Sequence, residues 1–129
     1  MVVGIDTYSN THLTSATKDA NSFVELLIDV FKADKQDVCV LLNGKATKEN
    51  ISEHILSIPK SAKRNDLIFF YFSGFSGDWS HEGDGKPGGF ICPHDYQDKG
   101  VIPDHALLRL FDQVSKQCGK NIVRSGYLS

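Results

Sequence analysis

Short apolar runs alternate with stretches of helical periodicity along the first 72 residues. Residues 2–5, 38–42 and 67–72 are almost continuously apolar, which predicts buried β-strands. Between them, apolar residues recur every three or four positions: Ala16, Ala20, Phe23, Val24, Leu27 and Phe31 in the first stretch, and Ile51, Ile55, Ile58 and Ala62 in the second. Thr47 is the expected N-cap of the second helix. This order of elements predicts an α/β fold, a three-layer α/β/α sandwich with a mostly parallel sheet.

The second half of the chain is less regular. We expect residues 73–89 to form a long glycine-rich loop, and residues 89–93 to form a short strand or an edge piece. A third helix is predicted next, with an apolar face of Leu107, Leu108, Phe111 and Val114. A fourth strand should follow, interrupted at residues 124–129. The chain is therefore interpreted as a single domain over residues 1–129, truncated at both ends because its first and last strands are short.

The composition limits which binding partners and which cellular compartment are expected for this chain. The 129 residues carry a formal net charge of -2, which gives no electrostatic reason to expect a nucleic acid. No apolar run reaches the 18 or so residues that span a membrane. Three cysteines, Cys39, Cys92 and Cys118, are distant and odd in number, so they form no disulfide framework. A reducing, cytoplasmic location fits this pattern best.

Catalytic or ligand-binding residues are first expected at the end of the third apolar run. The run stops in the small residues around Phe75, at the carboxyl end of a strand, which is where open α/β sheets place their active sites. Phe75 itself can neither transfer a proton nor bind a metal. Cys92 and His94 lie two residues apart and could form a nucleophile–base pair, but no oxyanion partner is evident. The favoured interpretation is that Cys92 is an ordinary structural residue.

A metal site is not indicated by the spacing of the polar residues. The ligand types present in the second half of the chain are His81, Glu82, Asp84, His94 and Asp95. None of their spacings is typical of a transition-metal site. Weak calcium binding is less improbable, because oxygen ligands tolerate irregular geometry. We therefore expect no cofactor, with weak calcium binding left open.

Six segments in order resemble one known family. Their patterns are a first strand and turn (2–8), L…A…DA…F (13–23), ATK-x-NI (46–51), D-x-I-x-F-Y-x-S-G followed by Phe75 (66–77), ICP-x-D (91–96) and I-x-D (102–104). Together they resemble the large-subunit half of the caspase/metacaspase-type cysteine peptidase domain (peptidase C14), in particular its fungal branch. The resemblance implies a caspase-like α/β/α fold and cysteine-type endopeptidase activity on polypeptide substrates.

Two departures from this family concern catalysis. The family pattern S-G-H-G carries the catalytic His, and Phe75 stands in its place here. The family nucleophile belongs to a D-x-C-x-S-G motif, and only Ser125 and Gly126 resemble it, without the Cys. The resemblance therefore implies a catalytically inactive pseudo-peptidase or an interaction module. Such a module could pair with a caspase-like partner through an exposed sheet edge.

One binding residue of the family is retained. Asp19 matches the Asp of the DA pair, which in metacaspases lies in an acidic pocket that accepts Arg or Lys. It could also be an ordinary first-turn helix carboxylate. Two further hypotheses stay open: an active cysteine peptidase that uses Cys92 and His94, and an unrelated small-molecule-binding α/β domain.

Overall fold

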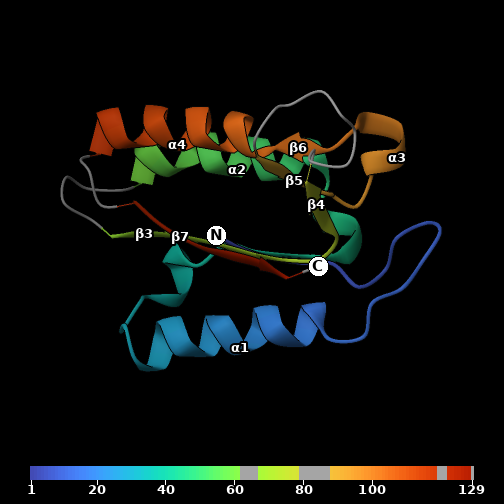
Figure 1. Cartoon of the computed structure of the whole chain (residues 1–129). Helices are drawn as coiled ribbons and strands as arrows, with labels where there is room; N and C mark the ends of the chain where they lie inside the picture. Colours follow the sequence, from blue (N-terminus) through green and yellow to red (C-terminus); the bar gives the residue numbers. More distant parts are fainter. Residues whose placement is uncertain (62–66, 79–87, 119–121, 129) are drawn as a thin grey trace.

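A four-stranded sheet divides the molecule into two helical layers (Figure 1). The computed structural model describes residues 1–61, 67–78, 88–118 and 122–128. The sheet has the order β2-β1-β3-β7, and every neighbouring pair is parallel. Its strands are β1 (Val2–Gly4), β2 (Val40–Leu42), β3 (Ile68–Ser73) and β7 (Ile122–Leu128). The predicted parallel sheet is therefore confirmed.

The helices lie on both faces of this sheet. Helix α1 (Ala16–Asp29) lies on one face, and α2 (Lys48–Ser61) and α4 (Asp104–Cys118) lie on the other (Figure 1). The predicted N-cap is confirmed, because the Thr47 hydroxyl accepts a hydrogen bond from the Asn50 N–H at 3.1 Å. The three-layer α/β/α sandwich is the fold expected from the sequence.

Strand β3 shows how the core is divided between the two layers. Its alternate residues Ile68, Phe70 and Phe72 are buried in the larger core, under α2 and α4. Phe69 and Tyr71 point to the other face and pack in the smaller cluster around α1, where they are only half-buried. Fully burying one large apolar side chain contributes about 1.5–3 kcal/mol, so the α2/α4 side supplies most of the hydrophobic stabilisation.

The fourth strand differs from the prediction. It was expected to be interrupted, but β7 runs through Leu128, which pairs with Ser73. The register shifts once: Phe70 pairs with Arg124 and Phe72 pairs with Tyr127. Two residues of β7 therefore face one residue of β3, which is the arrangement of a β-bulge. The expectation was wrong because Ser and Gly accommodate a bulge here, while backbone pairing with β3 continues.

A second, small antiparallel sheet follows β3. It has the order β4-β5-β6, formed by β4 (Ser76–Asp78), β5 (Gly89–Ile91) and β6 (Ile102–Pro103). The predicted loop over 73–89 is therefore wrong for β4, whose backbone pairs with β5, while residues 79–87 lie outside the described part. The short strand expected at 89–93 is β5.

Short helical segments complete the fold. They are η1 (Lys35–Asp37), η2 (Asn43–Lys45) and α3 (Tyr96–Lys99), and none of the three was predicted. In the part of the chain that the structure describes, no helix combines the length and apolar character needed to cross a bilayer.

Candidate functional site

A hollow of about 430 Å³ lies beside the carboxyl end of β3 and the first turn of α1. Its lining residues are His12, Leu13, Thr14, Ser15, Ala16, Asp19 and Ser73. Ser73 is the last residue of β3 and is buried, whereas Asp19 is half-buried. The structure thus places Asp19 near the carboxyl ends of the parallel strands, where active sites of open α/β folds lie. We call this feature the strand-end hollow.

The wall of the strand-end hollow is held by Asp6. Its carboxylate accepts hydrogen bonds from the Ala16 N–H at 2.7 Å, the Thr17 N–H at 3.2 Å and the Thr17 hydroxyl at 2.6 Å. Burial works to raise the pKa of Asp6, but these hydrogen bonds outweigh it and leave the pKa below its ordinary value. Asp6 therefore satisfies free N–H groups at the start of α1 from ten residues away.

Asn43 holds the other end of the same loop. Its side-chain oxygen accepts hydrogen bonds from the backbone N–H of Asp6 at 2.9 Å and of Thr7 at 3.2 Å. Its backbone has φ of 49°, a region that Asn tolerates better than most residues. The sequence did not predict Asp6 or Asn43 as part of the site. The usable signals were an Asp shortly after β1 and the Asn-Gly turn pair that follows β2.

Phe75 packs in a cluster of aromatic side chains next to this hollow. Its ring stacks on Tyr8 with ring centroids 4.6 Å apart, and Tyr96 meets Tyr8 edge-on at 5.7 Å. The Phe75 N–H donates to the Tyr8 hydroxyl at 2.9 Å, and that hydroxyl donates to the Cys92 carbonyl at 2.8 Å. Burial raises the pKa of Tyr8, so its hydroxyl remains a donor. Phe75 is thus a packed residue whose backbone and ring are both fixed.

Cys92 and His94 follow strand β5 and do not lie within it. Strand β5 ends at Ile91, so the two residues do not share a strand face. Cys92 is buried, and burial raises the pKa of its thiol to about 11. A thiol with that pKa is almost wholly protonated near neutral pH, whereas the thiolate is the nucleophile. The His94 backbone N–H donates to the Ala46 carbonyl at 2.8 Å, which fixes this segment against the start of α2.

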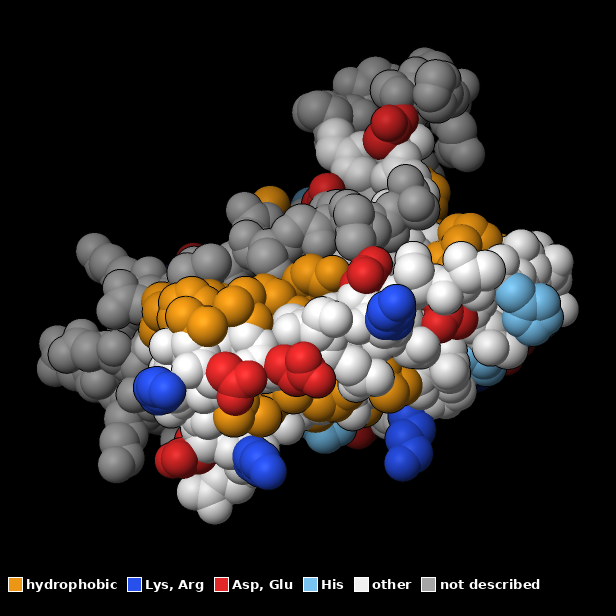
Figure 2. All heavy atoms as spheres, turned by 90° about the horizontal axis from the view of Figure 1, so that it is seen from below, with side chains coloured by type: hydrophobic (Ala, Val, Ile, Leu, Met, Phe, Trp, Pro, Cys, Tyr) orange, Lys and Arg blue, Asp and Glu red, His pale blue; other side chains and the backbone are white. Residues whose placement is uncertain are grey.

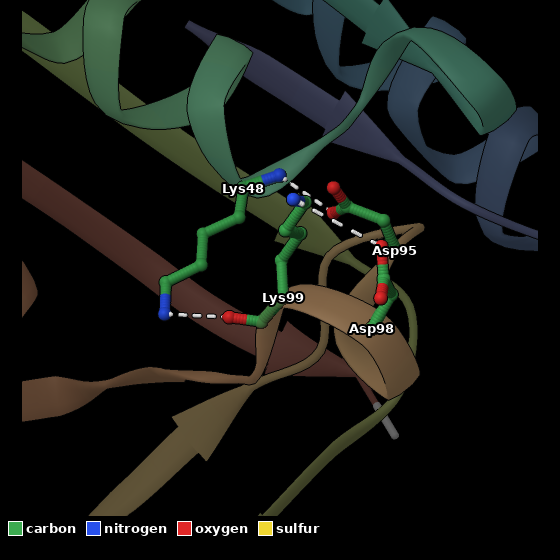
Figure 3. Close-up of polar contacts among 4 residues, drawn as sticks. All are labelled: Lys48, Asp95, Asp98 and Lys99. Atoms are coloured by element: carbon green, nitrogen blue, oxygen red, sulfur yellow. Dashed lines mark hydrogen bonds and ion pairs between the residues drawn. The ribbon is translucent and has the colours of Figure 1, made fainter.

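The Asp of the ICP-x-D segment has a structural role (Figure 3). The Asp95 carboxylate accepts a hydrogen bond from the Lys48 N–H, the first residue of α2, at 2.8 Å. The Lys48 ammonium donates to the Lys99 carbonyl at 3.0 Å, so the two segments are joined twice. The ion pair between Lys99 and Asp98 is exposed and 4.0 Å long, which gives it little weight.

The residues considered for metal binding are only partly described. His94 and Asp95 belong to the segment that packs against α2, and His81, Glu82 and Asp84 lie outside the described residues. Over residues 1–61, 67–78, 88–118 and 122–128, no group of three or more His, Cys, Asp or Glu side chains could hold a metal ion. Weak calcium binding stays a prediction.

The comparison with known families bears directly on this geometry. A family model described as metacaspase, peptidase C14 domain, matches residues 1–124, which include α1, β3, the strand-end hollow and Phe75. This chain belongs to the metacaspase family. The alternative of an unrelated small-molecule-binding domain is therefore set aside.

Three curated metacaspases show the extent of the similarity. Metacaspase-1B of Neurospora crassa is 26% identical over 120 residues, 85% of this chain and 28% of that protein. Metacaspase-1 of Sclerotinia sclerotiorum is 26% identical over 123 residues, 88% of this chain and 28% of that protein. Metacaspase-1 of Plasmodium falciparum is 27% identical over 119 residues, 83% of this chain and 19% of that protein. The chain thus spans less than a third of the length of these metacaspases.

The metacaspase match ends before Ser125 and Gly126. These two residues were compared with the end of the family's D-x-C-x-S-G motif, but they lie inside β7, at its bulge, and not after a strand. The comparison with that motif is therefore weaker than the comparison at Phe75, which lies inside the matched metacaspase region.

Proposed function

We propose that this metacaspase domain binds basic side chains of polypeptides but does not cleave peptide bonds by the family mechanism. Phe75 carries this proposal. A cysteine peptidase needs a group that takes the thiol proton and later gives a proton to the leaving amine. A phenyl ring has no exchangeable proton, and the stack with Tyr8 fixes it at this position.

Binding of a basic side chain is supported by Asp19. The carboxylate lines the strand-end hollow with Ser73 and is half-buried, which limits competition from water. In the described part of the chain, neither salt bridge involves Asp19. An Arg or Lys side chain could therefore form a charge-assisted hydrogen bond with it.

We propose that such a domain acts as an interaction module. Strands β2 and β7 are the outermost strands of the described sheet, and an edge strand offers unpaired backbone groups to another chain. A caspase-like protein that continues the sheet is the partner we propose. The distant, unpaired cysteines support a reducing, cytoplasmic location.

Peptide hydrolysis tests the proposed lack of activity. We expect no turnover of fluorogenic peptides with Arg, Lys or Asp before the scissile bond. Turnover that disappears in Cys92→Ala would contradict the proposal and favour the alternative, an active peptidase that uses Cys92 and His94. A small contaminating activity would persist in that variant, which makes it the control for peptidases from the expression host.

Calorimetric titration with N-acetyl-arginine amide tests the binding step separately. Asp19→Asn should weaken binding, because it removes the charge and leaves the shape of the hollow. Glu25→Gln is the matched control, since Glu25 is an exposed carboxylate on the same helix. Equal binding by both variants would show that the Asp19 carboxylate does not recognise the ligand.

A further inference from the structure

The junction between β2 and α2 contains an Asn-Gly pair in open surroundings. Asn43 and Gly44 are the first two residues of η2, which follows β2 directly. Asn43 is half-buried and Gly44 is exposed. The Asn43 backbone has φ of 49°, and a Cβ on Gly44 would meet nothing within 4 Å. The Gly44 backbone therefore has space around it on the protein surface.

Two fixed N–H groups point at the side-chain oxygen of Asn43. The backbone N–H of Asp6 donates to this oxygen at 2.9 Å, and that of Thr7 donates at 3.2 Å. The donors are held in place because Thr7 pairs with His12 in a β-bridge and the Leu13 N–H donates to the Asp6 carbonyl at 2.7 Å. Two preorganised backbone donors on one carbonyl oxygen are the arrangement by which enzymes stabilise an oxygen that gains negative charge.

We propose that Asn43 is a site of spontaneous deamidation, in which the Asp6 and Thr7 N–H groups act as an oxyanion hole. The Gly44 backbone nitrogen loses its proton to water and attacks Cγ of Asn43, and the side-chain oxygen takes the negative charge. As the carbonyl re-forms, the Cγ–Nδ2 bond breaks, and Nδ2 takes up a proton and leaves as ammonia. Water then opens the resulting succinimide ring at either carbonyl, which gives aspartate or isoaspartate at position 43.

The residue that follows Asn43 favours this attack. Glycine has no Cβ, so its nitrogen approaches the preceding side chain with the least obstruction. Asn21 provides the contrast within the same chain. It is also exposed, but it precedes Ser22 inside α1, where helical hydrogen bonding fixes the backbone. We therefore expect Asn43 to react and Asn21 to persist.

Isoaspartate at position 43 should loosen the start of α1. It lengthens the main chain by one methylene group and displaces the oxygen that holds the Asp6 and Thr7 N–H groups. Asp6 in turn carries the carboxylate that accepts hydrogen bonds from the N–H groups of Ala16 and Thr17. A covalent change at the end of β2 is thus transmitted to the wall of the strand-end hollow.

The added charge is the smaller part of this effect. Deamidation adds one negative charge to a chain whose formal net charge is -2. Over the face that carries α1, acidic and basic side chains are interspersed (Figure 2), so one more charge there adds to a mixed field. Aspartate also keeps the length of the main chain, and its carboxylate still accepts hydrogen bonds from both N–H groups. Isoaspartate is therefore the product with a structural consequence.

This inference goes beyond the proposed function, because it concerns a covalent change outside the strand-end hollow and requires no basic ligand. Ageing of the folded chain tests the reaction. The protein and a blocked synthetic peptide of residues 40–47, which keeps the Asn-Gly pair but lacks Asp6 and Thr7, are incubated in the same neutral buffer at physiological temperature. Peptide mapping by mass spectrometry measures aspartate and isoaspartate at position 43.

We expect loss of Asn43 to be about three- to tenfold faster in the protein than in the peptide, a modest part of what oxyanion donors contribute in enzymes. Equal or slower loss in the protein would overturn the proposal. Gly44→Ala should largely abolish the reaction, and the open space at this position lets the fold accept the added Cβ. Undiminished reaction in that variant would exclude attack by this nitrogen. Equal loss at Asn21 in the same sample would assign the reaction to exposure alone and would also overturn the proposal.

Hydrogen exchange of the purified isoaspartate form tests the effect on α1. We expect exchange of the Ala16 and Thr17 N–H groups at least about fivefold faster than in the unaged protein, the effect of about one lost hydrogen bond. Asn43→Asp is the matched control, since it adds the same charge without lengthening the main chain, and it should keep its protection. Unchanged exchange in the isoaspartate form, or equal acceleration in Asn43→Asp, would overturn the proposed transmission to α1.

Discussion

Phe75 and Tyr8 hold each other through both their rings and a hydrogen bond. The ring centroids are 4.6 Å apart, and the Phe75 N–H donates to the Tyr8 hydroxyl at 2.9 Å. The same hydroxyl donates to the Cys92 carbonyl, so one side chain joins three segments of the chain. The Phe75 side chain is therefore partly buried and packs against the larger core.

Removing the Tyr8 hydroxyl should destabilise the domain. Tyr8→Phe keeps the ring but leaves the Phe75 N–H and the Cys92 carbonyl without this partner, which costs about 1–3 kcal/mol for a buried group. The free energy of unfolding in urea measures the loss. Tyr96→Phe is the control, since it also removes a phenol hydroxyl and keeps the edge contact with Tyr8. Equal losses in the two variants would contradict the role given to the Tyr8 hydroxyl.

Asp95 should stabilise the start of α2. Asp95→Ala removes the acceptor of the Lys48 N–H and should lower the free energy of unfolding by about 0.5–2 kcal/mol, the usual range for a lost helix cap. Asp95→Asn retains a side-chain oxygen and should lose less. Asp98→Ala provides the comparison, because the Asp98 side chain is 84% exposed. If Asp98→Ala costs as much as Asp95→Ala, capping is not the cause.

The turn after β3 has no space for a side chain at Gly74. A Cβ there would lie 2.6 Å from the Tyr8 hydroxyl oxygen and 2.9 Å from the Phe72 ring. Gly74→Ala should therefore lower the melting temperature, at a cost of about 1–3 kcal/mol for overpacking. At Gly44 a Cβ would meet nothing within 4 Å, so Gly44→Ala should leave the melting temperature nearly unchanged. The reverse order of the two variants would show that this turn can relax.

Acid should weaken the domain partly through Asp6. Burial raises and hydrogen bonds lower the pKa of this carboxyl, and the net result is a folded pKa below the ordinary value of 3.8. A depressed folded pKa contributes stability above about pH 3.8, and this contribution is lost as the pH falls through the folded pKa. Asp6→Asn should flatten the acid side of a plot of unfolding free energy against pH. Parallel curves for the two proteins would argue against the prediction.

High pH should lower the free energy of unfolding in part through Cys92. Burial raises the pKa of its thiol from 9.0 to about 11. A raised folded pKa gives stability that is complete below about pH 9.0 and is lost as the pH rises toward about 11. In Cys92→Ala this part of the decline should disappear from the plot of unfolding free energy. An equally steep decline between these values in the variant would assign it to other groups.

The three long helices were predicted from local sequence patterns. Apolar periodicity located α1, α2 and α4, and Thr47 caps α2 as expected. The bulge in β7 was mistaken for a break, because Ser and Gly are typical of turns and only the pairing with β3 shows that the strand continues.

Only part of the candidate site was predicted from the sequence. Motifs singled out Phe75 and Asp19, but that Asp19 lies beside the end of β3 is known only from the structure. The groups that build the surrounding wall were not predicted, because Asp6 acts ten residues away on the start of α1 and Asn43 acts 37 residues away on Asp6. Contacts at such separations leave no periodic trace in the sequence.

The packing of Phe75 against Tyr8 has a consequence for any attempt to introduce a proton-transfer side chain at this position. An imidazole introduced by Phe75→His would enter a site whose backbone is held by the Tyr8 hydroxyl and whose side-chain direction is set by a ring stack. An imidazole in this position would stack on the Tyr8 ring, and the face of that ring accepts no conventional hydrogen bond that would orient a tautomer. Recovery of a proton-transfer group would thus require coordinated changes at Tyr8 and its neighbours. We therefore expect Phe75→His alone not to produce peptide hydrolysis.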